Sequence, residues 1–147
     1  MNGTVFASCG SGGRGKLMLA VNLKTRSEKR VRFERKTSLP YVPTPIGHED
    51  HVYLWTDLGV LARINAQNGE ETHRLRVNGN YSGSPVCIDG RLYCISEDGQ
   101  VVVVSTHDPK VLGRTSLGDR SYSTPAVANG RLYLRTFSRL MCLKAKS

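Results

Sequence analysis

The sequence predicts an all-β fold made of repeated units of about 40 residues. Three stretches of the chain match one another without a gap at a spacing of 40 residues. Each stretch has a proline near its start and a tyrosine further on: Pro45 and Tyr53, Pro85 and Tyr93, Pro125 and Tyr133. Turn signals recur every 8–12 residues, and no apolar pattern follows the period of a helix. Repeats of this kind form one supersecondary unit each, and most repeat folds serve as binding surfaces.

The clearest unit predicts four strands in succession. A first strand is expected at 84–88, and Asp89-Gly90 follows it as a favoured two-residue hairpin turn. Three further strands are expected at 91–96, 100–105 and 111–117. The third of them contains four consecutive valines, a β-branched run that is typical of a buried strand.

The other units follow the same plan with gaps at the two ends of the chain. The unit before the clearest one predicts strands at 51–56, 60–64 and 71–77, and the unit after it predicts strands at 126–128, 131–136 and 139–143. Residues 4–8 correspond to a second strand, so a first strand is missing there. We therefore expect one domain over 1–147 with two full and two partial repeats, bounded approximately at 4–40, 41–80, 81–120 and 121–147.

The run from Ser84 to Gly99 resembles the repeat of the PQQ-like, quinoprotein-type β-propeller family. It reads Ser-Pro-x-x-x-Asp-Gly-Arg-Leu-Tyr-x-x-Ser-x-Asp-Gly, and the resemblance covers residues 4–145. It implies a β-propeller with four-stranded antiparallel blades, here partial. The family's repeat also ends in a docking tryptophan, and Arg30, His73 and Gly113 stand at that position in this chain.

The resemblance also implies where a partner would bind and where the protein would act. The strands after Pro45, Pro85 and Pro125 would be innermost and would line an axial channel. A protein partner or small ligand is expected at the channel mouth, at Tyr41, Thr44, Tyr81, Ser84, Tyr122 and Thr124. The family suggests a bacterial periplasm or cell envelope, although the N-terminus shows no signal peptide.

Composition places only broad bounds on function. The chain has 147 residues, the size of one domain, and no apolar run approaches the roughly 20 residues that cross a bilayer. Its 21 basic and 12 acidic residues give a net charge of +9, which favours acidic partners weakly. Of its four cysteines, Cys87 and Cys94 would lie diagonally across one hairpin, about 7–8 Å apart. We expect all four to be free thiols, mostly buried.

Three motifs have the residue types of a binding site. Gly10–Lys16 matches a phosphate-binding loop, but a strand is expected after it in place of a helix, and Leu17 stands where a magnesium-binding hydroxyl belongs. His48 and His51 would face each other across a turn at Glu49-Asp50, or across a longer loop, as two weak metal ligands.

The third motif is basic. Residues 24–36 include seven basic and two acidic side chains. Arg30, Arg32 and Lys36 would alternate on one face of an outer strand, as a weak nucleic-acid candidate or as a charged edge that resists aggregation. Nucleic-acid binding is not expected to dominate, because Phe33 is the only aromatic residue in this segment.

Catalytic signatures are missing from the sequence. There is no G-x-S-x-G motif, and the quinoprotein dehydrogenases of this superfamily use adjacent cysteines and a tryptophan around the quinone. This chain has no adjacent cysteines, and its only tryptophan, Trp55, follows a core pattern. We therefore expect no enzyme activity and no cofactor.

The function expected from the sequence is that of a non-catalytic scaffold, the C-terminal part of a larger propeller, which self-associates through open blade edges. The alternatives are a fragment of a quinoprotein-type dehydrogenase, the sensor propeller of a bacterial signalling protein, and a basic nucleic-acid-binding module.

Overall fold

The described part of the chain is built from antiparallel strands. The structure is a computed structural model, and it describes residues 3–10, 16–26 and 28–144. Apart from the short 3-10 turn η1 (Glu28–Arg30), its regular elements are strands. The strands are β1 (Thr4–Cys9), β2 (Leu17–Asn22), β3 (Val31–Arg35), β4 (Ile46–His48), β5 (His51–Trp55), β6 (Val60–Asn65), β7 (Glu71–Arg76), β8 (Val86–Ile88), β9 (Arg91–Ile95), β10 (Gln100–Ser105), β11 (Val111–Ser116), β12 (Ala126–Ala128), β13 (Arg131–Arg135) and β14 (Leu140–Lys144).

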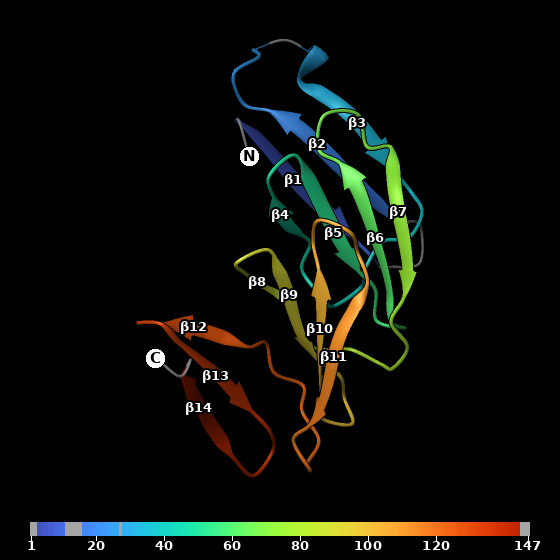
Figure 1. Ribbon diagram of the computed structural model, residues 1–147. Helices are drawn as coiled ribbons and strands as arrows, with labels where there is room; N and C mark the ends of the chain where they lie inside the picture. Colours follow the sequence, from blue (N-terminus) through green and yellow to red (C-terminus); the bar gives the residue numbers. More distant parts are fainter. Residues whose placement is uncertain (1–2, 11–15, 27, 145–147) are drawn as a thin grey trace.

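These strands form four separate sheets that follow one another along an arc (Figure 1). The second sheet (β4–β7) and the third sheet (β8–β11) have four strands each. The first sheet (β1–β3) lacks an inner strand, and the fourth sheet (β12–β14) lacks an outer one. The predicted all-β propeller with two full and two incomplete blades is therefore confirmed. No helix among the described residues is long and apolar enough to cross a membrane.

The hairpin turns explain the register of the inner strands. Asp89 and Gly90 have φ angles of 46° and 70°, and Asn129 and Gly130 have 51° and 66°. Two residues with positive φ form the tight turn that matches the twist of paired strands. Glu49-Asp50 is also a two-residue turn, with φ of 50° at Glu49, so the longer loop is not formed there.

A β-bulge recurs at the same place in three sheets, and the repeat pattern alone does not predict it. The pairing of the third strand of the repeat with the outer strand shifts by one residue at this place. The shift lies between Ala20 and Val21, between Arg63 and Ile64, and between Val103 and Val104. One extra residue in the outer strand bends that strand and increases the local twist. The bulges give an independent alignment of the first three sheets.

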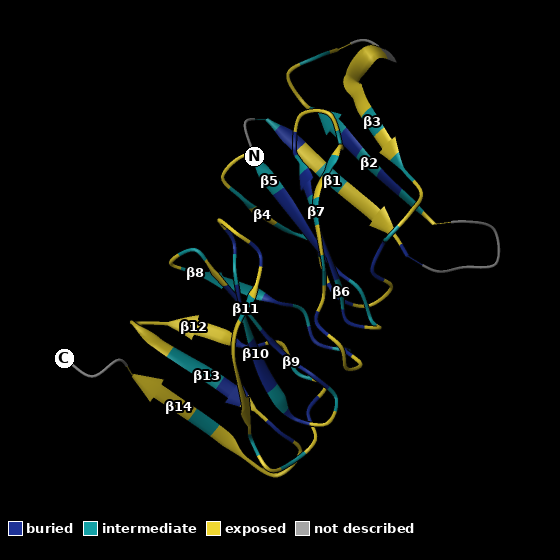
Figure 2. Cartoon of the chain, turned by 45° about the vertical axis from the view of Figure 1, so that its right-hand side comes forward, coloured by how far each residue is buried: buried dark blue, intermediate teal, exposed yellow. Residues whose placement is uncertain are grey.

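The apolar core consists of layers between successive sheets (Figure 2). Alternate residues of β5 point to opposite layers: Tyr53 and Trp55 pack toward the third sheet, while Val52 and Leu54 pack toward the first. The middle strands are therefore buried on both faces, which explains their nearly continuous hydrophobic sequence.

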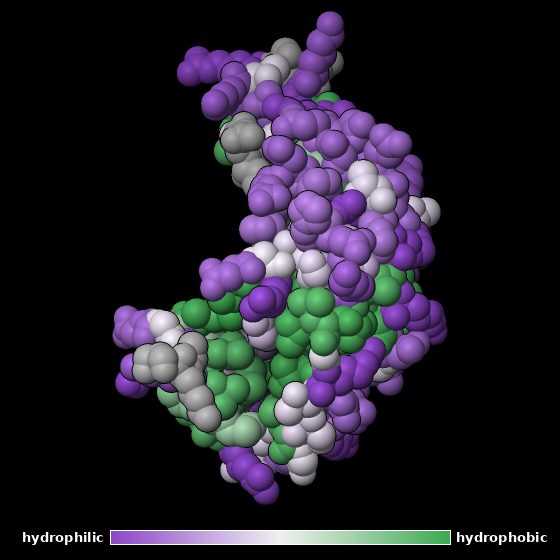
Figure 3. All heavy atoms as spheres, viewed as in Figure 1, coloured by the Kyte–Doolittle hydropathy of each residue, from purple (hydrophilic) through white to green (hydrophobic). Residues whose placement is uncertain are grey.

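Packing is less complete toward the C-terminal end. An apolar groove of about 420 Å³ remains between the third and fourth sheets, and residues lining it include Val103, Leu134 and Met141. Apolar atoms gather over this end of the molecule in Figure 3, whereas the opposite end is mostly hydrophilic in that view. The strands of the fourth sheet are correspondingly more exposed than those of the second and third (Figure 2).

Candidate functional site

Thr44, Ser84 and Thr124 connect neighbouring sheets at the inner strands. The Thr44 amide donates a hydrogen bond to the Ser84 hydroxyl over 2.9 Å, and the Ser84 amide donates to the Thr124 hydroxyl over 2.9 Å. Each bond joins residues 40 positions apart. Since β4 also lies against β8, this hydroxyl ladder holds the inner strands together. Two of the predicted channel-mouth hydroxyls therefore already accept bonds from the protein itself.

Replacing Ser84 with alanine is expected to lower the free energy of unfolding by about 0.5–1.5 kcal/mol, because the Thr44 amide loses its acceptor. Thr44 is exposed and water can replace the lost partner, so a value near the lower limit is expected. Ser84→Thr is the matched control, since threonine keeps the hydroxyl. Urea unfolding monitored by circular dichroism measures both variants, and equal stability of the two would contradict the role of the ladder.

Tyr41 is held at the surface by the turn between β5 and β6. The Asp57 carboxylate accepts hydrogen bonds from the amides of Tyr41 and Val42 over 2.7 and 2.9 Å. The Tyr41 residue is 66% exposed, and the nearby Leu58 is also exposed. The chain thus presents apolar side chains at this end of the sheets on a fixed backbone.

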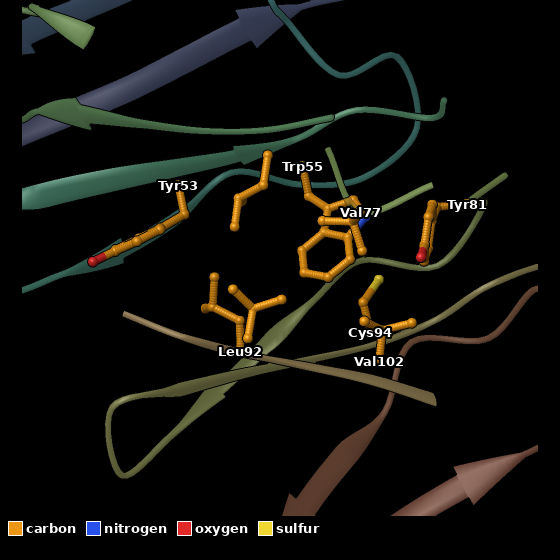
Figure 4. Close-up of a cluster of buried hydrophobic side chains, with 9 residues drawn as sticks. Tyr53, Trp55, Val77, Tyr81, Leu92, Cys94 and Val102 are labelled. Atoms are coloured by element: carbon orange, nitrogen blue, oxygen red, sulfur yellow. The ribbon is translucent and has the colours of Figure 1, made fainter. Parts of the chain in front are cut away.

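Tyr81 is a core residue, and this corrects its predicted place at the channel mouth. It is 1% exposed, its hydroxyl donates to the Asn78 carbonyl over 2.8 Å, and its ring meets Trp55 edge-on at a centroid distance of 5.2 Å. Figure 4 shows Tyr81 beside Trp55 in the layer between the second and third sheets. Burial raises the pKa of Tyr81 to about 12, so the phenol stays neutral. The repeat alignment could not distinguish Tyr81 from Tyr41, because both have the same sequence spacing.

Tyr122 belongs to an exposed aromatic and cationic cluster that the sequence analysis did not identify. Its ring contacts Phe137 edge-on at 5.3 Å, and the Arg120 guanidinium lies 5.5 Å from the Tyr122 centroid and 5.8 Å from that of Phe137. Arg120 also donates to the Tyr122 hydroxyl over 2.6 Å. Phe137 lies on the β13–β14 turn, and the backbone hydrogen bond from its amide to the Arg120 carbonyl brings the two segments together.

A polar pocket of about 610 Å³ adjoins Arg120. Glu97, Asp98 and Asp119 contribute carboxylates to it. Glu97 accepts a hydrogen bond from the Ser82 hydroxyl over 2.6 Å, and Asp98 accepts one from Ser96. Hydrogen bonds from the Ser138 hydroxyl and amide lower the pKa of Asp119 to about 2. The pocket therefore places acidic groups beside the basic and aromatic cluster.

The weak metal candidate remains a pair of histidines. His48 and His51 face each other in register across the β4–β5 hairpin, as expected, and His48 lies 3.8 Å from the Glu49 carboxylate. Within the described ranges, no group of three or more His, Cys, Asp or Glu side chains is placed to hold a metal ion.

The basic segment is arranged differently from the prediction. Of Arg30, Arg32 and Lys36, only Arg32 lies in β3, while Arg30 ends η1 and Lys36 follows the strand. Arg32 is the extra residue of the bulge opposite Ala20 and Val21, and its guanidinium donates to the Gln67 side chain of the second sheet. The bulge breaks the alternation that would have placed the three side chains in one row.

The four cysteines form no disulfide with one another, but two of them are not buried as expected. Cys94 is buried, and burial raises the pKa of its thiol to about 12, while burial also raises the pKa of Cys87. Cys9 and Cys142 are exposed, because they lie on outward faces of the first and last sheets. Of the glycine-rich motif Gly10–Lys16, residues 11–15 lie outside the described residues.

Four antiparallel sheets in succession, with the inner strands β4 and β8 in contact, define a section of a β-propeller of four-stranded blades. The chain belongs to the PQQ-like propeller family: the family model described as outer membrane protein assembly factor BamB matches residues 21–112, which is more than half of the chain. No curated protein matches the sequence.

Solved structures show the same fold at low sequence identity. BamB from Moraxella catarrhalis is 16% identical with a TM-score of 0.75, and the match covers 97% of this chain and 43% of that chain. The quinohemoprotein alcohol dehydrogenase ADHIIG from Pseudomonas putida HK5 is 12% identical with a TM-score of 0.66, and the match covers 90% of this chain and 27% of the enzyme. Apo AztD from Citrobacter koseri is 13% identical with a TM-score of 0.60, and the match covers 83% of this chain and 34% of that chain. This chain therefore spans less than half the length of each.

Proposed function

We propose that this chain is a section of a larger PQQ-like propeller and acts as a non-catalytic scaffold that binds a protein partner. The binding surface is the end of the sheets that presents Tyr41 and Tyr122, near the mouth of the axial channel. The observation that carries this proposal is the exposed Tyr122–Phe137–Arg120 cluster, because aromatic rings and arginine supply much of the energy in protein interfaces.

The cluster is exposed and is ordered before a partner binds. Phe137 is 61% exposed and Tyr122 is 46% exposed, yet their mutual contact and Arg120 already orient them. Rings that are ordered before binding lose little conformational entropy when a partner covers them. The similar structure of BamB, named as an assembly factor of outer membrane proteins, supports a protein partner and a location in the bacterial cell envelope.

The environment of Trp55 supports a role without catalysis. Quinoprotein dehydrogenases share the fold, but the only tryptophan of this chain is fully buried between the second and third sheets. A side chain enclosed in this way does not reach a quinone in the axial channel. The chain also has no pair of adjacent cysteines.

Within this proposal each sheet is one blade, with the approximate boundaries 4–40, 41–80, 81–120 and 121–147. Thr44, Ser84 and Thr124 then act mainly by positioning the inner strands, and Tyr41 and Tyr122 make the contacts. The C-terminal position of this section in a longer chain stays a prediction, which the coding sequence upstream of Met1 decides.

The test is a quantitative pull-down from a bacterial envelope fraction with matched double variants. The double variant Tyr41→Ala/Tyr122→Ala is expected to weaken capture at least about tenfold, because two aromatic contacts with the partner are lost. Arg30→Glu with Arg32→Glu is expected to leave capture nearly unchanged, and Leu112→Ala is a control at an exposed apolar residue on β11. If only the arginine variant loses binding, with a steep dependence on salt, the electrostatic alternative is correct.

A further inference from the structure

A pocket of about 220 Å³ lies at the end of the second sheet that presents Tyr41. Lys16, Arg74 and Arg76 line it, and Asp57 has the one carboxylate among the lining residues. Its walls come from the segment that joins the first two sheets, from the β5–β6 turn and from the outer strand β7. We call the space between these three cations the basic pocket.

The basic pocket lies inside the chain, between two sheets that are packed on each other. Met18, two residues after Lys16, is buried with Leu39 and Leu54 in the layer between the first and second sheets. Leu39 also lines the pocket. The backbone on this side of the pocket is therefore fixed by the apolar layer, and the shape of the pocket follows from the packing of the two sheets.

Arg74 is held in place by bonds within the protein. Its Nε atom donates to the Glu71 carboxylate over 2.7 Å, and a terminal nitrogen donates to Glu71 over 2.9 Å and to the Ser38 hydroxyl over 2.6 Å. Arg35 of the first sheet also donates to Glu71, so two arginines share one carboxylate. Arg114, the corresponding residue of the next repeat, likewise donates to a backbone carbonyl. Arg74 therefore has a structural role, and its charge is only partly compensated.

Arg76 and Lys16 have no such role. Neither side chain forms an ion pair or a hydrogen bond with another described residue. The Asp57 carboxylate already accepts hydrogen bonds from two backbone amides. Three cations against one carboxylate leave the lining residues with an excess of two positive charges. The basic pocket can therefore accept a negative charge from outside the protein.

The corresponding pocket of the next repeat has the opposite charge. It is the polar pocket of about 610 Å³ described above, where Glu97 and Ser116 occupy the positions that Asp57 and Arg76 hold 40 residues earlier. Ser116 also has the same place in its sheet, since Gln100 pairs with Ser116 as Val60 pairs with Arg76. The repeat therefore does not require an arginine at this position, and the positive charge is particular to the second of the two complete sheets.

Exposed apolar side chains border the basic pocket. Leu58 lines it and is 68% exposed, while Tyr41 and Val42, whose amides bind Asp57, are exposed as well. A free anion would contact the cations alone. A peptide segment with a carboxylate beside an apolar side chain would contact both parts of the surface at once. Complementary charge orients such a segment, and apolar contacts supply much of the binding energy.

We propose that the basic pocket receives an aspartate or glutamate side chain of the protein partner, and that a neighbouring apolar side chain of the same segment packs on Leu58. This inference rests on the proposed function and deepens it, because it names the chemistry of the segment that binds beside Tyr41. The net charge of +9 on the chain would also attract an acidic segment before contact.

Selection from a displayed library of random short peptides tests the proposal with the purified chain. The selected peptides are expected to have aspartate or glutamate close to a large apolar residue. One of them, synthesised with a fluorescent label, is then titrated with the chain and followed by fluorescence anisotropy. The double variant Lys16→Glu/Arg76→Glu is expected to weaken its binding at least about tenfold, because like charges then face each other. Lys16→Gln/Arg76→Gln should weaken it less, since no repulsion is added.

The double variant Arg91→Glu/Lys110→Glu is the matched control. It makes the same change in net charge at exposed positions next to the β8–β9 and β10–β11 turns, at the opposite end of the sheets, and should bind the peptide almost as well as the unaltered chain. Far-UV spectra of all three double variants should be unchanged, because the replaced side chains are exposed.

Three results would overturn the proposal: a library that yields no binder, selected peptides without acidic residues, or equal binding by the variant at Lys16 and Arg76 and by the control. A loss of the same size in both would mean that only the net charge of the chain attracts the peptide, and it would also overturn the proposal. A failure of the proposed function would appear in the other experiment, as envelope capture that does not depend on Tyr41 and Tyr122.

Discussion

Replacing Trp55 with alanine is expected to lower the free energy of unfolding by about 3–5 kcal/mol, one of the largest effects of any single substitution in this chain. Trp55 is fully buried at the centre of the layer that joins the second and third sheets, against Tyr81 and Cys94 (Figure 4). Alanine would leave a cavity that the surrounding strands, fixed by their pairing, fill only in part. Loss of this layer would weaken the contact between the two complete sheets.

Trp55→Phe is the matched variant for this prediction. The Trp55 Nε1 atom is buried without a hydrogen-bond partner, so phenylalanine removes an unpaired donor while keeping much of the ring. The Trp55→Phe variant should lose clearly less free energy of unfolding than the Trp55→Ala variant. Urea unfolding measures both variants. Circular dichroism is the probe, because Trp55 is the only tryptophan and its replacement removes the fluorescence signal. The protein concentration is kept fixed, because self-association would contribute to the measured stability. A loss below about 1 kcal/mol for alanine would show that this layer does not hold the sheets together.

Gly99→Ala is expected to destabilise the fold by about 3 kcal/mol or more, through two effects that add. Gly99 has a φ of 79°, which residues with a Cβ adopt at a cost of about 1–2 kcal/mol. A Cβ atom there would also lie 1.9 Å from the Asp119 carbonyl oxygen, so the segment that leads into the fourth sheet must move. That movement would disturb Asp119, which holds the β13–β14 turn through Ser138.

Gly118→Ala separates the two effects. Gly118 has a nearly equal φ of 72°, but no atom lies within 4 Å of a Cβ built on it. Its substitution should cost only the conformational part, about 1–2 kcal/mol. The same denaturation experiment compares the two variants. Equal losses at Gly99 and Gly118 would mean that the contact with Asp119 contributes nothing.

The candidate site shows that a sequence repeat does not predict which of two equivalent side chains is exposed. Tyr41 and Tyr81 have equal places in the sequence pattern, yet one is exposed and the other is buried against Trp55. The difference depends on the sheet that covers each loop, and spacing along the chain contains no information on that contact. In the same way, Arg120 and Phe137 are 17 residues apart on two different turns, and tertiary contacts bring them together: the hydrogen bond between their backbones and the bonds of Ser138 to Asp119.

The charged residues show a similar limit. The sequence predicted a row of Arg30, Arg32 and Lys36, but the β-bulge and the turn η1 place them on different elements. A bulge results from the strain of pairing a twisted outer strand with its neighbour, so it follows from the assembled sheet and not from local residue preferences.

What the sequence by itself determined is the repeat, the order and approximate bounds of the strands, the two-residue turns and the propeller family. These follow from local chemistry: alternation of side chains along a strand, and the ability of Asp-Gly and Asn-Gly to adopt positive φ. Only the tertiary structure decided which tyrosines are buried and which hydroxyls join the inner strands. These properties depend on contacts between different sheets, such as the hydrogen bonds between residues 40 positions apart in the hydroxyl ladder, which form only when successive sheets stack and exclude water from the layers between them.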